Sequence, residues 1–397
     1  MTSVISEKLP TPIEVQEGVV QLLPTGRAAF SKIIDMINNA ESSLRVHAFV
    51  WRDDVIGNKI AKAIHDAAER GVAVSISKDR IAAAYEYSAG SYQSFFHKKP
   101  KQTDKFQAWF LGKVYRRKNK LRPVANSLST SLLKHPKVDI VHQNKRFDHT
   151  KVFVADKNKL ILGSMGIGDA HHTENAEMAV YLEGKPLIDR YTKRTLSDCR
   201  FETKRKLDFL VHTKFNPDYK TLLSERLALI ANAKQTLHIE MAYLGDARYT
   251  RAIIKAVQRG VQTTIVTSKA DVLGNLNLGT CHKILKRTGF PSHLKVFIRP
   301  KMVHTKTQVV DGEITDLGSA NFTPLSHGVY DEINVLIKNK AFSLQTIDAI
   351  ESDAKECVLV DSALKYRRLI HAFEKAIVGY QSRPRIKRRS NGYRRLR

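Results

Sequence analysis

The sequence predicts an α/β protein built from two similar halves, each with a mixed, largely parallel sheet. Three observations lead to this prediction. The chain has 397 residues, enough for two cores or for one large domain made of two halves. Helix-like and strand-like segments alternate in the same order twice. One array of polar residues also occurs twice, at an offset of 155 residues, which indicates an internal repeat.

The first half opens with a helix, a strand, a second helix and a second strand. Residues 30–40 have apolar side chains at helical spacing, and residues 44–51 form a strand-like run. Residues 58–70 predict the next helix, which Gly71 ends, and residues 72–76 predict a buried strand.

The second half repeats this order. We expect a helix over 222–233, a strand over 237–243, a helix over 249–259 that Gly260 ends, and a strand over 261–266. The two halves therefore share one local plan.

The repeated array starts with a histidine, a lysine two residues later and an aspartate five residues after the lysine. In both copies a glycine-serine pair places its serine fifteen residues after the histidine, and a glutamate follows at twenty-eight. The first copy is His149, Lys151, Asp156, Ser164 and Glu177, and the second is His304, Lys306, Asp311, Ser319 and Glu332. One such match is weak in a basic chain, but two with shared spacing indicate a functional site.

Both arrays fall on a third predicted strand, over 152–155 and 307–310. Alternation along an extended chain points each histidine and its lysine to the same side. A further strand follows at once, over 160–163 and 315–318, and ends at the glycine-serine pair, where the backbone must approach something closely.

Two histidines and two lysines in one place suit phosphodiester exchange. One neutral imidazole can attack phosphorus while the other, protonated, donates to the leaving oxygen. The lysines supply positive charge without a metal, and Ser164, Ser319 and Asn321 can donate hydrogen bonds to the phosphate oxygens. Glu177 and Glu332 are placed to accept from the histidine rings and fix their tautomers.

The aspartates of the arrays have a different expected role. Asp156 and Asp311 stand at strand ends, where a carboxylate anchors a turn rather than touching substrate. We expect no metal and no other cofactor.

The arrays resemble the paired HKD motifs of the phospholipase D superfamily, over roughly residues 22–337. Within it the likeness is to bacterial cardiolipin synthases of the phospholipase D type, through the segments FVWRDDVIG (49–57), AERGV (68–72), GSANF (318–322) and DEINV (331–335). The resemblance implies two pseudo-symmetric α-β-α sandwich halves with one active site at their interface. It also implies transfer of a phosphatidyl group through a phosphohistidine to the hydroxyl of a second lipid, and precedent in two-repeat phospholipases favours His149 as the nucleophile.

This chain departs from the family pattern at two places. Gly166 stands where the second copy has Asn321, so one side-chain donor is missing. The segment EMAYL (240–244) replaces the Pro-Tyr-Phe usual in cardiolipin synthases. These departures leave the lipid substrates open, and water, glycerol and a second phospholipid are all candidate acceptors.

The formal net charge of +27 favours an anionic partner. The excess is concentrated in an insertion at about 80–137, where basic residues alternate with aromatic ones, and in a tail over 383–397 with eight basic residues. Rings beside cations suit an anionic membrane surface, stacking on single-stranded nucleic acid, or an insertion that buries its rings internally. The tail suits either an anchor on anionic lipid or a solvated end without a defined partner.

The remaining features concern organisation and location. We expect an N-terminal extension over 1–20, a first repeat over 21–200, a second repeat over 201–345, a helical segment over 346–382 and the basic tail. No signal peptide or transmembrane helix is apparent, and the three cysteines are few and scattered. We therefore expect a cytoplasmic protein, peripherally associated with the membrane and active as a monomer because both motifs are in one chain.

The leading functional prediction is phosphatidyltransferase or phospholipase D-type exchange on phospholipids such as phosphatidylglycerol, like that of cardiolipin synthases. The alternative is a metal-independent nuclease or other phosphodiesterase of the same superfamily. Nucleic-acid affinity by itself does not separate them, because any chain this basic binds polyanions. A third interpretation is a basic scaffold that keeps the fold without catalysis.

Overall fold

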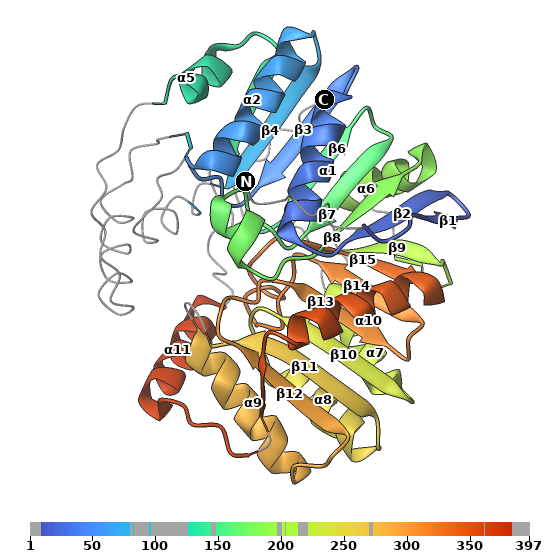
Figure 1. Cartoon of the computed structure of the whole chain (residues 1–397), viewed down its shortest axis with the longest axis vertical. Helices are drawn as coiled ribbons and strands as arrows, with labels where there is room; N and C mark the ends of the chain where they lie inside the picture. Colours follow the sequence, from blue (N-terminus) through green and yellow to red (C-terminus); the bar gives the residue numbers. More distant parts are fainter. Residues whose placement is uncertain are drawn as a thin grey trace, which may run out of the picture.

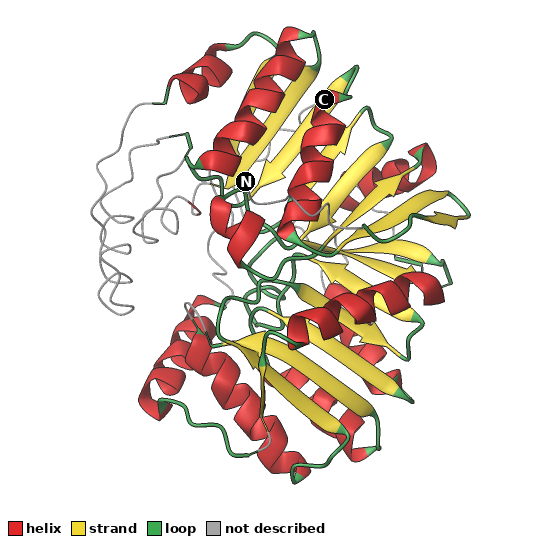
Figure 2. Cartoon of the chain, viewed as in Figure 1, coloured by secondary structure: helices red, strands yellow, loops and turns green. Residues whose placement is uncertain are grey.

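The computed structural model describes residues 9–79, 82, 95–96, 126–143, 148–196, 201–202, 204–212, 221–269, 273–360 and 362–382. Two halves stack on one another, each with one sheet of eight strands and helices packed against it (Figures 1 and 2). The α/β architecture in two similar halves, predicted from the repeat, is confirmed.

The first sheet has the strand order β1-β2-β8-β7-β6-β3-β4-β5. Its strands are β1 (Ile13–Val15), β2 (Gly18–Leu23), β3 (Ser43–Ala48), β4 (Ala73–Asp79), β5 (Val138–Gln143), β6 (Val152–Ala155), β7 (Lys159–Gly163) and β8 (Ala179–Glu183). The helices of this half are α1 (Gly26–Asn38), α2 (Val55–Glu69), α5 (Ser127–Lys134), the short π-helix η1 (Ala170–Glu174) and α6 (Lys185–Leu196).

The second sheet has the order β16-β12-β11-β10-β13-β14-β15-β9. Its strands are β9 (Leu207–His212), β10 (Thr236–Met241), β11 (Gln262–Ser268), β12 (Leu294–Arg299), β13 (Lys306–Val310), β14 (Ile314–Gly318), β15 (Glu332–Lys338) and β16 (Val358–Val360). Its helices are α7 (Thr221–Asn232), α8 (Ala247–Gln258), α9 (Gly274–Thr288), α10 (Lys340–Ala354) and α11 (Arg368–Gln381).

The sheets are mixed, but the prediction that they are largely parallel is wrong. Among the described strands, parallel pairing is confined to β3–β4–β5 and β10–β11–β12, where helical crossovers return the chain in the same direction. The strands that carry the arrays form hairpins instead. Asp156 and Lys157 have φ of 51° and 54°, and Asp311 and Gly312 have 54° and 66°, which suits the tight turns of antiparallel pairs.

Local signals explain where the helices begin and end. Helix α2 starts three residues earlier than the apolar pattern predicts, because the Asp54 carboxylate accepts the backbone N–H of Gly57 and caps the first turn. Gly71 and Gly260 follow α2 and α8 with φ of 98° and 88°, a conformation that favours glycine.

Three apolar clusters give the layer order helix, sheet, sheet, helix. Along β6, Phe153 and Ala155 pack under α1 and α2, while Val152 and Val154 face the other way. That inner cluster continues into residues of the second sheet such as Val309 and Val335. A third cluster lies between the second sheet and helices α7, α8 and α9. The two sheets therefore share one core.

The edge strands of both sheets include residues that the sequence analysis assigned to terminal segments. Strands β1 and β2 place part of the expected 1–20 extension in the first sheet, and β16 places part of the 346–382 segment in the second. Most of the basic-aromatic insertion and the whole 383–397 tail lie outside the described residues. Among the residues that are described, no helix has the length and apolar character needed to cross a bilayer.

Candidate active site

The two halves exchange backbone contacts next to their histidines. The N–H of His149 donates to the carbonyl of Asp331 at 2.9 Å, and the N–H of His304 donates to the carbonyl of Ala176 at 2.8 Å. Asp331 and Ala176 each directly precede the glutamate of the opposite half's array. This crossing brings the two arrays together at the interface of the halves.

Each histidine contacts the glutamate of the other half. His149 Nδ1 lies 3.1 Å from both carboxylate oxygens of Glu332, and His304 Nδ1 lies 3.0 Å and 3.1 Å from those of Glu177. When Nδ1 carries the proton of this hydrogen bond, Nε2 of each ring is the atom left for chemistry. The sequence indicates that glutamates orient histidines, and the structure adds that each pair spans both halves.

The two serines support the glutamates. Ser164 Oγ donates to Glu177 and accepts the N–H of Met178 at 3.1 Å. Ser319 Oγ donates to Glu332 at 2.5 Å. In this structure their protons are directed at the carboxylates, and hydrogen bonds from these hydroxyls to phosphate oxygens stay a prediction.

The lysines are buried and close to each other. Lys151 and Lys306 each donate through Nζ to the carbonyl of the histidine two residues earlier. Burial lowers the pKa of Lys151 to about 8, and burial together with the charge of Lys151 lowers that of Lys306 to about 7, although Glu177 and Glu332 oppose the shift. Two lysines buried beside each other form a place prepared for an anion.

Burial also sets the ionisation of the histidines and glutamates. Burial and the two lysine charges hold the pKa of His149 well below its usual value, and burial does the same for His304. Burial raises the pKa of Glu332 to about 7. Burial acts on Glu177 in the same direction, but the imidazoles of His304 and His171 outweigh it and hold its pKa well below the usual range.

The aspartates of the arrays point away from the interface. Asp156 accepts the backbone N–H groups of Glu41, Ser42 and Ser43 at 2.7–3.2 Å, and this lowers its pKa despite partial burial. Asp311 accepts the corresponding three N–H groups, of Lys234, Gln235 and Thr236, where β10 begins. Both aspartates therefore join a hairpin turn to the start of the neighbouring strand, as their position in the sequence suggests.

Three side chains around the histidines were missed by sequence reasoning. The ring of Tyr330 stacks on His149 at 5.3 Å between centroids, and Phe49 meets it edge-on at 4.9 Å. His171 Nδ1 lies 2.6 Å from Glu177, and its ring is 4.8 Å from that of His304. Only the repeat register gives a signal for His171, because it occupies the place of Ser326 in the second copy.

His171 also explains why Gly166 replaces Asn321. A Cβ atom on Gly166 would lie 3.0 Å from Nε2 of His171 and 3.2 Å from the side chain of Val50. The imidazole thus fills the space that a side chain at 166 would need. The second copy keeps Asn321, whose buried Oδ1 has no hydrogen-bond partner among the described residues.

The same corner contains the only group of described residues able to hold a metal ion. The ligand atoms of His171, Glu177 and His304 lie within 4.8 Å of one another. They already hydrogen-bond to one another, and the charge of Lys306 acts on both His304 and Glu177. These contacts favour an anion over a cation here.

A buried polar network lies behind Ser319. The Asp316 carboxylate accepts from Arg226 at 2.7 Å, from Gln308 at 3.1 Å and from Asn334 at 2.7 Å. Asn334 Oδ1 in turn accepts the N–H of Ala320 at 3.1 Å, next to Ser319. The network therefore holds the turn whose serine supports Glu332.

The first half has an apolar core at these four places. The strand registers of the two sheets make Phe153 equivalent to Gln308, Ile161 equivalent to Asp316 and Ala179 equivalent to Asn334. Ile33 of α1 and Arg226 of α7 match because each lies ten residues before the strand that follows its helix, β3 or β10. All four first-half residues belong to one apolar cluster. At these four places, charged and polar side chains lie behind the serine that supports Glu332 and His149, whereas apolar side chains lie behind its counterpart Ser164.

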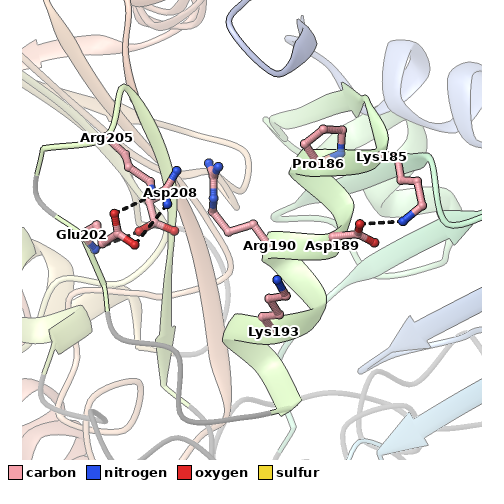
Figure 3. Close-up of a pocket in the computed structure, with 8 residues that line it drawn as sticks. All are labelled: Lys185, Pro186, Asp189, Arg190, Lys193, Glu202, Arg205 and Asp208. Carbon is pink, nitrogen blue, oxygen red and sulfur yellow. Dashed lines mark hydrogen bonds and ion pairs between the residues drawn. The ribbon is translucent and has the colours of Figure 1, made fainter.

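A separate cavity of about 530 Å³ lies between α6 and the segment that leads into β9 (Figure 3). Opposite charges pair along its walls, as between Lys185 and Asp189 at 2.6 Å and between Arg205 and Glu202 at 2.9 Å. Neither array contributes a residue to it, so it is not the candidate active site.

A family model described as "Cardiolipin synthase, PLD-like domain" matches residues 33–198 and 227–354, well over half of the chain. The chain belongs to this phospholipase D-like family. The matched segments contain both arrays and the cross-paired glutamates, so the resemblance drawn from the motifs is confirmed.

Curated relatives extend over most of the chain. A cardiolipin synthase of Clostridium perfringens is 24% identical over 401 residues, covering 91% of this chain and 76% of the relative. Cardiolipin synthase B of Escherichia coli K12 is 21% identical over 389 residues, covering 91% and 86%.

Solved structures share the fold of this phospholipase D-like chain. The phosphatidylserine synthase of Haemophilus influenzae Rd KW20 superposes with a TM-score of 0.65 at 13% identity, covering 94% of this chain and 95% of that one. A polyphosphate kinase from Porphyromonas gingivalis gives 0.51 at 12% identity, covering 91% and 53%. The shared fold by itself does not name a substrate.

Proposed function

We propose that this protein is a phospholipase D-type phosphatidyltransferase that exchanges phosphodiester bonds in phospholipids, as cardiolipin synthases do. The observation that carries the proposal is the cross-paired site: two histidines, each oriented by a glutamate from the opposite half, beside two buried lysines. The cardiolipin synthases among its relatives support a lipid substrate.

In the first step, His149 Nε2 attacks phosphorus while the bond from phosphorus to the leaving oxygen breaks. His304 donates its Nε2 proton to that oxygen, and the lysine charges stabilise the phosphate oxygens. Burial lowers the pKa of His304, but the ionised carboxylate of Glu177 opposes that shift and favours a protonated His304, which supports this division of roles. An arriving phosphate anion offsets the lysine charges and favours that protonation further.

In the second step, a hydroxyl acceptor attacks the phosphorus of the phosphohistidine. His304 takes the hydroxyl proton, the phosphorus–nitrogen bond breaks, and His149 is restored. The acceptor is the hydroxyl of a second lipid in a cardiolipin synthase-like reaction, or water in a phospholipase reaction. Both histidines belong to one chain, so a monomer at the membrane surface would hold the complete site.

The roles of the histidines are separated by the leaving group. A phosphodiester that releases p-nitrophenolate needs no acid in the first step, so His304→Ala should release the first equivalent of p-nitrophenolate at close to the wild-type rate while losing natural phospholipid exchange. His149→Ala should lose both substrates. Equal loss of both substrates in the two variants would contradict the assignment.

The substrates are tested with purified protein and phosphatidylglycerol, alone and with phosphatidylethanolamine or a primary alcohol, followed by lipid mass spectrometry. We expect phosphatidyl transfer products that disappear in His149→Ala. The alternative function, a metal-independent nuclease or other phosphodiesterase, is supported by the net charge of +27. It would be favoured by cleavage of DNA or RNA in chelator without lipid turnover.

A further inference from the structure

Helix α11 has one face turned to the protein and an opposite face that is exposed and apolar. On the inner face, Glu374 accepts the N–H of Leu276 at 2.7 Å, and Val378 is buried. On the outer face, Leu369, Phe373 and Tyr380 are 87%, 38% and 68% exposed. Their spacing of four and seven residues puts them on one stripe of the helix.

The charges around this stripe have one sign. Lys365, Arg367, Arg368 and Lys375 are all exposed. The single acid of residues 362–382 is Glu374, which is buried against α9. The outer face therefore presents apolar and cationic side chains without a carboxylate. This combination is typical of helices that lie in the interface of an anionic membrane.

The inner face of α11 reaches the candidate active site. Val378 packs in one cluster with Leu276, Leu325 and Tyr330, and the ring of Tyr330 stacks on His149. Figure 1 shows α11 beside α9 at the margin of the molecule. A surface that binds the outer face would thus be joined to the catalytic histidine through one layer of side chains.

We propose that α11 is a membrane-docking helix. Leu369 and Tyr380 enter the boundary between headgroups and acyl chains of an anionic bilayer, while the flanking lysines and arginines meet lipid phosphates. The role of this docking, which is to hold the active site at the surface that contains the substrate, rests on the proposed function. Binding itself is measurable without turnover.

The test uses a double variant of the full chain, Leu369→Gln together with Tyr380→Gln, and compares it with wild type. The matched control is Leu133→Gln with Leu344→Gln, which changes two leucines on helices α5 and α10 that are 49% and 45% exposed. Co-sedimentation uses vesicles of phosphatidylcholine with and without phosphatidylglycerol. We expect wild type and control to bind the phosphatidylglycerol vesicles, and the α11 variant to partition about tenfold more weakly.

A separate assay keeps the two proposals distinguishable. Short-chain phospholipid dissolved as monomers should be turned over equally by all three proteins, whereas bilayer substrate should be turned over poorly by the α11 variant. Absence of turnover in wild type would remove the proposed function but leave the vesicle result standing. Unchanged vesicle binding by the α11 variant would overturn the docking helix. The docking helix would also be overturned if the α11 variant lost a dimer in sedimentation velocity without weaker vesicle binding, because the stripe would then join two copies of the chain.

Discussion

Replacing the polar network behind Ser319 with its first-half counterparts tests whether that network positions His149. The variant carries Arg226→Ile, Gln308→Phe, Asp316→Ile and Asn334→Ala, so each polar residue receives the residue found at the matching place in the first half. The transplanted set is apolar and forms part of a well-packed cluster in its own half.

The structure indicates how stability should change. Arg226→Ile alone strands the fully buried Asp316 carboxylate and should cost about 3–5 kcal/mol of unfolding free energy. The fourfold variant removes both charges together. Apolar replacement of a buried ion pair is neutral or stabilising, and repacking costs about 1–3 kcal/mol, so most of the loss should be recovered.

Activity should follow a different order. The fourfold variant leaves the N–H of Ala320 without the Asn334 acceptor and frees the turn that holds Ser319 under Glu332. A displacement of about 1 Å can cost about 10²-fold in rate, so we expect transfer activity to fall by roughly that factor in a protein that still folds. Asn334→Ala alone, which keeps the ion pair, should show a smaller loss of the same kind.

Chemical denaturation and lipid transfer assays on the same preparations check this prediction. A fourfold variant with native-like stability and full activity would refute the positioning role. If that variant does not fold, Asn334→Ala decides the matter, because full activity there would refute the role equally.

Four further predictions concern single side chains. Lys306→Arg keeps its charge above the lysine pKa of about 7, so the alkaline limb of the kcat/KM pH profile should move upward, and an unmoved limb would show that this charge does not govern phosphate binding. Glu177→Gln should lower kcat by about 10²–10⁴-fold, because a neutral amide no longer stabilises protonated His304, and wild-type kcat would exclude that role. His171→Ser removes a neighbour that lowers the pKa of His304. Because His304 acts as the acid in the first step, the alkaline limb of the pH–rate profile should shift to higher pH, and an unmoved limb would contradict this coupling. Asp156→Ala should lower the free energy of unfolding by roughly 1–2 kcal/mol with little effect on kcat. Because folding lowers the pKa of Asp156, its contribution to stability is present at neutral pH and disappears as the pH falls through the folded-state pKa. A stability difference from wild type that persists in acid would contradict this account.

The sequence by itself determined the repeat and most of its local structure. Predicted strands over 152–155, 160–163 and 315–318 agree with β6, β7 and β14 to within one residue, because each is a short apolar run ended by a strong turn signal. It also predicted which residue types would handle phosphate, since constant spacing in two copies is visible without a fold.

Tertiary structure alone decided which residues of the two copies meet. Spacing within one repeat leaves open which histidine each glutamate contacts, and the crossing of the halves gives Glu177 to His304 and Glu332 to His149. It also decided that His171 shares Glu177, and that hairpins at Asp156 and Asp311 pair β6 with β7 and β13 with β14 in antiparallel fashion. Periodicity reports which face of a strand is buried, whereas the partner across an interface depends on how two sheets pack, and no local pattern encodes that.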